Sequence, residues 1–481
     1  MDSSDSKQSF NTYHNGLLAH AIHALRKAEP SLCTDTKAPF WQKITGIVFL
    51  LSIIALLMFN QKWAWLLINW IIFMTLSCAV IVKMTLALIG FFVNKHGRNR
   101  MTHDQPNILP LYSILIPLYQ ENKSTLQSLF NHLRQLIYPR DKLEIKVLLE
   151  SDDDKTIALV QAMQLPDYIE IISIPASEPR TKAKACNYGL QCVRGEFVSL
   201  YDAEDRPDPN QLLHALHFFY KKENENIACL QCQLNFYNSN ENWLTRLFTI
   251  EYTAWFDLIL PVLEWARMPI PLGGTSNHFR ADILKKVHGW DPYNVTEDAD
   301  LGIRLSRLGY RIKMLHSTTY EEANCHLWNW IRQRTRWIKG YMQTYLVHMR
   351  HPYLFWKQVG SIGFFGFQLF VGGTIVCNLA NIPMWLMSLS LYCFPHWHPM
   401  QLSGTLYSLS IFNFYIGTVG MIALNMLGVV ARKNWHLILS AFTAPFYWIL
   451  MSLASYRALY QFIINPSYWE KTEHGISSEA G

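Results

Sequence analysis

The chain has 481 residues and a net charge of +6; half of its residues are hydrophobic and 16% are charged. This length allows one catalytic domain and a further region. The apolar residues concentrate at 44–93 and 361–463, which excludes a wholly soluble protein, and the modest charge gives no indication of a nucleic-acid partner.

The N-terminal part divides into a polar leader, 1–40, and an apolar region, 41–100. The leader is expected to be flexible or weakly helical, with no readable function. Residues 44–59 and 63–93 are two apolar runs, and about 20 residues suffice to cross the hydrocarbon core, so a transmembrane helical hairpin is predicted. Lys83 interrupts the second run and is expected to snorkel to the interface.

Residues 105–350 have the pattern of a soluble α/β domain, in which apolar strand patterns alternate with helical periodicity. Such alternation predicts a mostly parallel sheet with ligands at the carboxyl ends of its strands. Cys229 and Cys232 lie on a strand-like segment without a second cysteine pair, so a structural role and reduced thiols are expected. The predicted strands are 111–117, 143–149, 168–174 and 196–201, and the first predicted helix is 123–137.

The C-terminal region, 351–464, can be divided in two ways. In one, 361–394 is a single tilted span, 406–430 is a second span and 435–464 is an interfacial helix. In the other, 361–394 is a hairpin broken at 381–383 and 435–464 is a true span. Both give an even number of crossings.

Basic residues flank the apolar blocks. Such clusters are also typical of nucleic-acid binding, but beside apolar spans they more often mark the cytosolic membrane face. The first arrangement keeps Arg432 and Lys433 on that face and is preferred. The sequence therefore predicts a multi-pass protein of the inner or plasma membrane, with the domain 105–350 and the tail 465–481 in the cytosol. The flanking residues are Lys95, Arg98, Arg100, Arg332, Arg334, Arg336, Lys339, Arg432 and Lys433.

Four polar segments follow one another through the soluble domain, at 116–122, 201–207, 296–298 and 333–337. Each alone is also typical of a solvated turn, a helix N-cap or an interfacial belt. Together they resemble the inverting family 2 glycosyltransferases, and more narrowly the cellulose, mannan, chitin and hyaluronan synthase branch. The resemblance covers 107–350 and implies an α/β fold of the GT-A type, inserted between transmembrane helices.

The resemblance implies a site for Mg²⁺ or Mn²⁺, which neutralises the departing diphosphate of a nucleotide-sugar donor. Asp202 matches the first acid of the family's DxD element, and Glu204 stands where the second usually lies. Asp205 follows directly, and which of the two completes the metal site is left open.

The same resemblance assigns the catalytic carboxylates to Glu297 and Asp298. Asp298 matches the general base, which takes the proton of the acceptor hydroxyl as that hydroxyl attacks C1 of the sugar. A β-linked product from an α-linked donor is implied. Gln333, Arg336 and Trp337 share one helical face, because they stand at i, i+3 and i+4; the family places Trp337 under the acceptor sugar and Arg336 near the diphosphate.

The remaining site residues are also implied by the resemblance. Lys182 is expected near the diphosphate, and either Glu150 or Asp152 at the nucleobase. The tail resembles the gating loop of processive synthases, although a solvated tail is the alternative. Further nucleotide contacts are expected from Pro117, Tyr119 and Glu121, acceptor contacts from Gly274, Thr275 and Ser276, and gating-loop contacts from Trp469, Lys471 and Thr472.

The predicted function is transfer of a sugar, from a UDP-sugar or from GDP-mannose, to a growing β-linked polysaccharide. Transfer of one sugar to a lipid phosphate carrier is the alternative, and a non-catalytic membrane scaffold is a third. The expected partners are the donor, a glycan or glycolipid acceptor and the lipid bilayer. The sequence leaves open a homo-oligomer, an export partner and the identity of the sugar.

Overall fold

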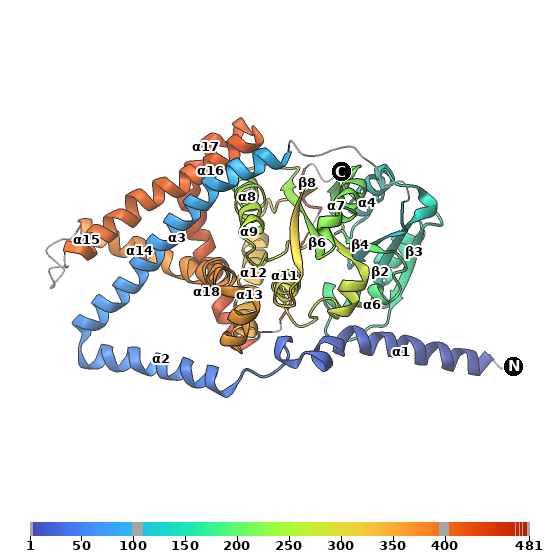
Figure 1. The fold of residues 1–481 in the computed structure, drawn as a ribbon, viewed down its shortest axis with the longest axis horizontal. Helices are drawn as coiled ribbons and strands as arrows, with labels where there is room; N and C mark the ends of the chain where they lie inside the picture. The colour runs from blue at the N-terminus through green and yellow to red at the C-terminus, as the bar shows by residue number, and fades with distance from the viewer. Residues whose placement is uncertain are drawn as a thin grey trace.

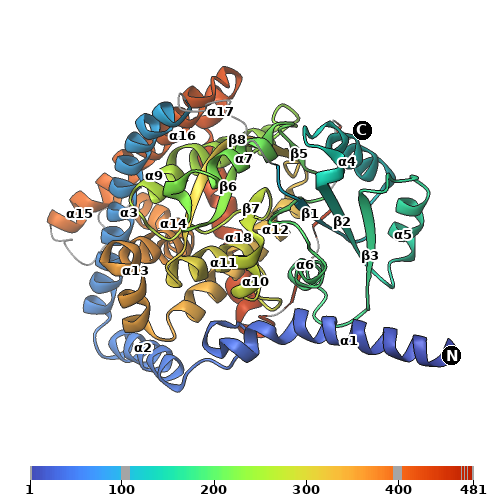
Figure 2. The ribbon, with the colours of Figure 1, turned by 45° about the vertical axis from the view of Figure 1, so that its right-hand side comes forward.

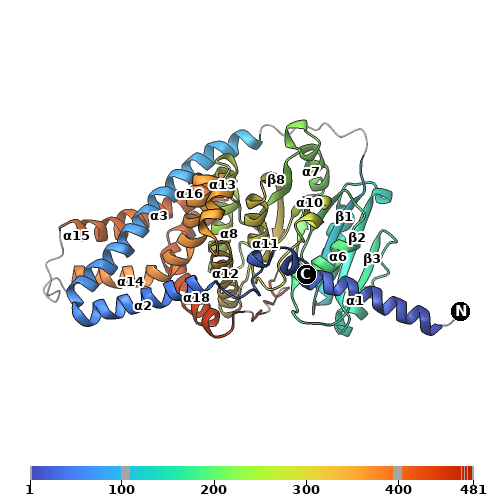
Figure 3. The same cartoon turned by 60° about the horizontal axis from the view of Figure 1, so that its bottom comes forward.

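The computed structural model describes residues 3–98, 109–393, 404–466, 468–470, 472–473 and 475–478. An α/β domain lies beside a group of long helices, and the N-terminal helix extends along the underside of the domain (Figures 1 and 3).

One eight-stranded sheet forms the centre of the α/β domain, in the order β3-β2-β1-β4-β7-β6-β8-β5. Four of its seven described pairings are parallel, so the sheet is mixed, with its parallel part at β3-β2-β1-β4. The strands are β1 (Tyr112–Leu118), β2 (Leu143–Glu150), β3 (Ile169–Ile174), β4 (Phe197–Leu200), β5 (Arg206–Pro207), β6 (Ile227–Phe236), β7 (Asn277–Arg280) and β8 (Arg311–Glu321).

Helices cover both faces of this sheet, so β2 and β4 are buried along their whole length. Side-chain caps fix two helix starts: Asn122 accepts a hydrogen bond from the amide of Thr125, and Thr181 from that of Lys184. The helices are α4 (Lys123–Gln135), α5 (Asp154–Gln161), α6 (Lys182–Gln191), α7 (Gln211–Phe219), α8 (Trp243–Thr253), the π-helix η4 (Ala254–Ile259), α9 (Leu260–Trp265), α10 (Ala281–Lys286), α11 (Glu297–Arg307) and α12 (Leu327–His348).

Four apolar helical stretches are long enough to cross a membrane: Phe40–Phe59, Leu66–Val93, Pro352–Ser390 and Leu406–Arg432. A bent pair, Trp435–Ala441 and Ala444–Ile464, turns by 66°. The predicted break at 381–383 is absent from the described chain, since these residues lie inside a helix; the number of crossings stays a prediction. The helices are α2 (Phe40–Phe59), α3 (Gln61–Arg98), α13 (Pro352–Phe367), α14 (Gly373–Cys393), α15 (Gly404–Ile411), α16 (Thr418–Arg432), α17 (Ile438–Ala441) and α18 (Ala444–Ile464).

The polar leader is a folded and packed part of the molecule. Helix α1 (Ser3–Ala28) lies beside α6 (Figure 2), where Gln191 donates to the carbonyl of Leu17 at 2.9 Å. Arg350 donates to the carbonyls of Cys33 and Thr36 at 2.8 and 2.6 Å. The sequence predicted a flexible or weakly helical segment because its packing partners lie far away along the chain.

Candidate active site

The carboxyl end of β4 meets the amino end of β7 at one edge of the sheet, because these strands are antiparallel and Leu200 pairs with Asn277. Loops from this edge bring Asp202 and Gly274 to Lys182, the first residue of α6. The Lys182 ammonium lies 2.5 Å from Asp202 Oδ1 and 2.5 Å from the carbonyl oxygen of Gly274. Three separately predicted segments therefore form one site.

Opposite charges surround this ammonium. Burial alone lowers the pKa of Lys182, but the carboxylates of Asp202, Asp298 and Glu297 raise it above the usual lysine value. Burial, and then the neighbouring Glu297, raise the pKa of Asp298 well above that of an ordinary carboxyl. A cationic Lys182 suits an anionic ligand, and a carboxyl of raised pKa suits a general base working near neutral pH.

Replacing Glu297 with glutamine should move the acid limb of the kcat–pH profile to lower pH. The charge of Glu297 raises the pKa of Asp298, and Asp298 must be ionised to accept a proton, so removing that charge lets the base remain active in more acidic solution. Initial rates across pH in wild type and variant test this. An unchanged acid limb would contradict it.

The three carboxylates of the acidic loop after β4 have different surroundings. Asp202 and Glu204 line a cavity at the site, whereas Asp205 is buried. One Asp205 oxygen accepts the amide of Asp202 at 2.7 Å and also the hydroxyl of Thr275. Asp205 therefore holds the loop to the glycine-rich segment, and Glu204 is the better second candidate for a metal ligand.

Several of the predicted nucleotide contacts lie at the carboxyl ends of β1 and β2. Glu150 is buried and pairs with Lys184 at 2.9 Å, so its carboxylate has a structural partner. Asp152 is more exposed and pairs with Arg180, which also bonds Tyr119. These positions favour Asp152 over Glu150 as the nucleobase contact. The cavity lining does not include Pro117, Tyr119, Glu121, Glu150 or Asp152.

Helix α12 presents Gln333, Arg336 and Trp337 to the cavity, as their spacing predicted. Gln333 accepts a hydrogen bond from Asn324 at 2.9 Å, and the Trp337 ring stacks on Tyr252 with 6.2 Å between centroids. Gly274 and Thr275 also line the cavity. Ser276 does not; its hydroxyl bonds Thr319 at 2.6 Å.

The described part of the tail packs on the domain. Trp469 lines the cavity, with the Arg336 guanidinium 5.3 Å from its ring centroid, and Thr472 is buried. The Glu322 carboxylate accepts the amides of Gly475, Ile476 and Ser477, the last two at 2.9 and 2.6 Å. This packing differs from a solvated tail. Lys471 lies outside the described residues, and the gating role stays a prediction.

Replacing Glu322 with glutamine should loosen the tail, because a neutral amide oxygen accepts hydrogen bonds more weakly than a carboxylate. Limited proteolysis should cut after residue 465 several times faster in the variant. The exposed Glu225→Gln serves as the matched control. Equal cleavage rates in both variants would show that Glu322 does not hold the tail.

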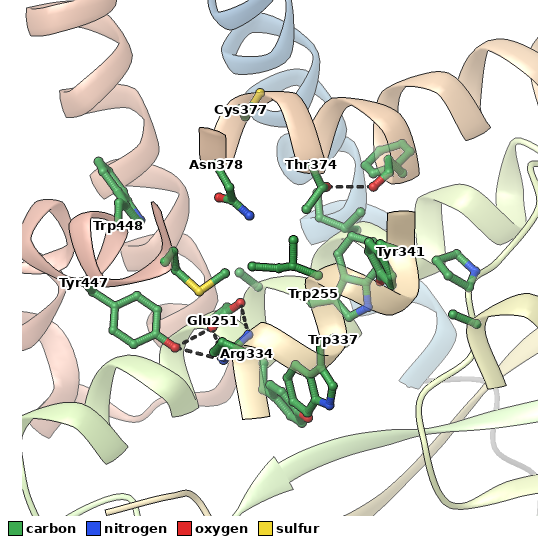
Figure 4. A pocket seen from close by; sticks show the side chains of 18 of the residues that line it. Glu251, Trp255, Arg334, Trp337, Tyr341, Thr374, Cys377, Asn378, Tyr447 and Trp448 are labelled. Carbon is green, nitrogen blue, oxygen red and sulfur yellow. Dashed lines mark hydrogen bonds and ion pairs between the residues drawn. The ribbon is translucent and has the colours of Figure 1, made fainter. Parts of the chain in front are cut away.

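The cavity of about 510 Å³ continues from Asp202, Glu297 and Asp298 into the long helices. In Figure 4, Arg334 bonds Glu251 and Tyr447, while Asn378 faces them from α14. Arg334 is thus buried in an ion pair, with nitrogen–oxygen distances of 2.9 and 2.5 Å, rather than exposed on a basic membrane-facing surface. Trp448 completes this wall.

Several lining residues escaped the sequence analysis. Glu251, Tyr252 and Trp255 come from α8 and η4, which carry no recognisable motif. The amides Asn378 and Asn425 could have indicated this part of the cavity from the sequence, because polar groups in apolar helices mark substrate pathways. Lys83 also lines the cavity. Its snorkelling to the interface stays a prediction.

The α/β domain has the GT-A fold that glycosyltransferases use. The chain matches a solved structure, a mannosyltransferase from Pyrobaculum calidifontis in complex with GDP-Man and Mn²⁺, with a TM-score of 0.53 and 16% identity. The match covers 82% of this chain and 99% of that one. At this identity the likeness shows the fold alone.

The sequence comparison agrees with the fold. Residues 110–340 match the family described as "Glycosyltransferase like family 2", which confirms the predicted resemblance. A probable glycosyltransferase, YdaM of Bacillus subtilis, is 30% identical over 48% of this chain and 55% of its own length. The beta-monoglucosyldiacylglycerol synthase of Nostoc is 25% identical over 72% and 76%. The chain spans about half the length of the first curated relatives it matches.

Proposed function

We propose that this protein is a membrane-bound inverting glycosyltransferase that adds sugars from a nucleotide-sugar donor to a growing β-linked polysaccharide. The observation that carries the proposal is the single cavity joining Asp202 and Asp298 to the membrane-type helices. Its walls contain both aromatic rings and amides such as Asn378, and sugars stack on rings and hydrogen-bond to amides. An orientation with the catalytic domain in the cytosol is part of this proposal.

The site fits a divalent cation, Mg²⁺ or Mn²⁺, held by Asp202 and Glu204. Both carboxylates face the cavity, and Asp202 already binds a cation, the Lys182 ammonium. Two carboxylates suit Mg²⁺, which is commonly held by one or two carboxylates plus substrate phosphates. When bound, the cation would neutralise charge on the leaving diphosphate.

The protein's own groups supply the remaining chemistry. Asp298 takes the proton from the acceptor hydroxyl as the oxygen forms its bond to C1 and the C1–diphosphate bond breaks. Lys182 and Arg336 stabilise the departing negative charge. Trp337 holds the acceptor sugar against its ring, and Trp469 lines the cavity next to Arg336.

The test uses the full-length protein, purified in detergent, with a panel of UDP- and GDP-sugars and either Mg²⁺ or Mn²⁺. Release of nucleoside diphosphate should require one cation and one donor, and the labelled product should be a polymer cleaved by β-specific glycosidases. A single glycolipid band would overturn the polymer proposal.

The second candidate is transfer of a single sugar to a membrane lipid. It is favoured by the match to the Nostoc glycolipid synthase, which extends beyond the soluble domain to 72% of this chain. A lipid acceptor is also compatible with a cavity that continues between the apolar helices. Product sizing in the same assay, with and without added diacylglycerol or polyprenyl phosphate, separates the two candidates.

Replacing Trp337 with alanine should shorten the product and leave the donor KM nearly unchanged. Stacking contributes about 0.5–1.5 kcal/mol beyond buried area, so the growing end should dissociate up to about tenfold more often. Gel sizing of radiolabelled product measures this, with Trp337→Phe as the control that retains a ring. Equal lengths for the alanine variant and wild type would remove Trp337 from the acceptor site.

A further inference from the structure

Trp290 is a buried residue in contact with the proposed base. Its side chain is 1% exposed, and its indole Nε1 donates to Asp298 Oδ1 at 2.8 Å. The other carboxylate oxygen faces the cleft, because a methyl group placed on Gly274 would lie 3.7 Å from Oδ2 and 3.9 Å from the Lys182 ammonium. One oxygen of Asp298 is thus held, while the other is available to an acceptor.

The backbone of Trp290 is fixed in turn by Asn187. The Asn187 amide accepts from the Trp290 N–H at 2.9 Å and donates to the Trp290 carbonyl at 2.8 Å. It also donates to the carbonyl of Ala21 in α1 at 3.0 Å. Gly289 has φ +61°, and an added Cβ there would lie 2.1 Å from the Asn187 oxygen, so only glycine allows this approach.

A second anchor holds the same turn from the side of α11. Arg304 donates to the carbonyls of Val287 and Gly289 at 2.7 and 2.8 Å. The Trp290 ring also meets Phe279 edge to face, with 5.8 Å between centroids. The indole therefore has little freedom to leave Asp298.

We propose that Trp290 is a positioning residue that orients the Asp298 carboxylate, with Asn187 connecting it to the N-terminal helix. The proposal rests on the proposed role of Asp298 as the base. The indole N–H satisfies Oδ1 and turns Oδ2 toward the acceptor hydroxyl. Without this donor the carboxylate can rotate toward the Lys182 ammonium and lose its alignment for proton transfer.

The experiment replaces Trp290 with phenylalanine in the full-length enzyme. We expect kcat to fall roughly 10- to 100-fold, part of the ~10²–10⁴-fold contribution of a general base. The donor KM should stay within about twofold, since Trp290 contacts no predicted nucleotide group. Trp243→Phe is the matched control, because it also removes an indole hydrogen bond, the one to Thr443 at 2.7 Å.

A second variant separates the hydrogen bond from packing. Incorporating benzothienylalanine at position 290 keeps the bicyclic ring and removes only the N–H donor. It should lose as much kcat as the phenylalanine variant, with unchanged thermal unfolding and nucleoside diphosphate binding. Full kcat in this variant would overturn the positioning role.

An Asp298→Asn enzyme in the same assay distinguishes failure of the Trp290 proposal from failure of the proposed base. If it is inactive while the position-290 variants are fully active, only the role of Trp290 fails. If Asp298→Asn retains wild-type kcat, the base assignment fails as well.

Discussion

Asp298→Asn should reduce kcat by about 10²- to 10⁴-fold while nucleotide binding persists. Asparagine preserves the size of the side chain and can still accept the indole hydrogen bond of Trp290, but it cannot take a proton from the acceptor hydroxyl. The predicted nucleotide contacts come from other segments, so donor affinity should change little. Nucleoside diphosphate release and calorimetric titration with the diphosphate measure the two quantities.

The matched control is Asp282→Asn, the same substitution at an exposed position on α10. It should retain wild-type rate and product size. Polymer formation at wild-type rate by the Asp298 variant would refute the base assignment. Lost diphosphate binding would instead indicate that the substitution disturbs the cleft as a whole.

Asp202→Asn should abolish metal-dependent transfer, with a loss of about 10³-fold that excess Mn²⁺ does not restore. A metal ion supplies several kcal/mol of charge stabilisation, and each 1.36 kcal/mol is a factor of ten in rate. The substitution also removes a charge partner of Lys182. Rates across a Mn²⁺ titration, together with Mn²⁺ binding in the presence of nucleoside diphosphate, measure the effect.

The other two acids of the loop provide the comparison. Glu204→Gln should raise the Mn²⁺ concentration needed for half-maximal rate, because Glu204 lines the cavity. Asp205→Asn should mainly lower thermal stability, since its carboxylate holds the loop through Asp202 and Thr275. If Asp205→Asn instead raised the Mn²⁺ requirement and Glu204→Gln did not, Asp205 would be the second metal ligand.

Local patterns predicted much of the soluble domain. Apolar runs bounded by turn residues gave five of its elements to within one or two residues, among them β1 and β2. The spacing of Gln333, Arg336 and Trp337 placed these side chains on one face because helical periodicity is a local property. The position of Asp202 after a strand likewise required only its immediate neighbours.

Such local patterns could not predict which segments, distant in the sequence, come into contact. The parallel-sheet expectation missed the antiparallel β7, and β7 is what brings Gly274 to Lys182. Asn187 binding Ala21 across α1 and α6, and Glu322 holding the tail, depend on the same long-range packing.

The sequence by itself thus determined the class of protein and predicted the roles of its acids. The acidic loop, the Thr-Glu-Asp segment and the residues of the α12 face follow one another in this order along the sequence. Only the tertiary structure decided which Asp298 oxygen faces the cleft, that Asp205 holds a loop, and that the cavity continues into the membrane-type helices. The physical reason is that residue type and spacing fix local conformation, whereas side-chain partners depend on how the sheet and helices pack.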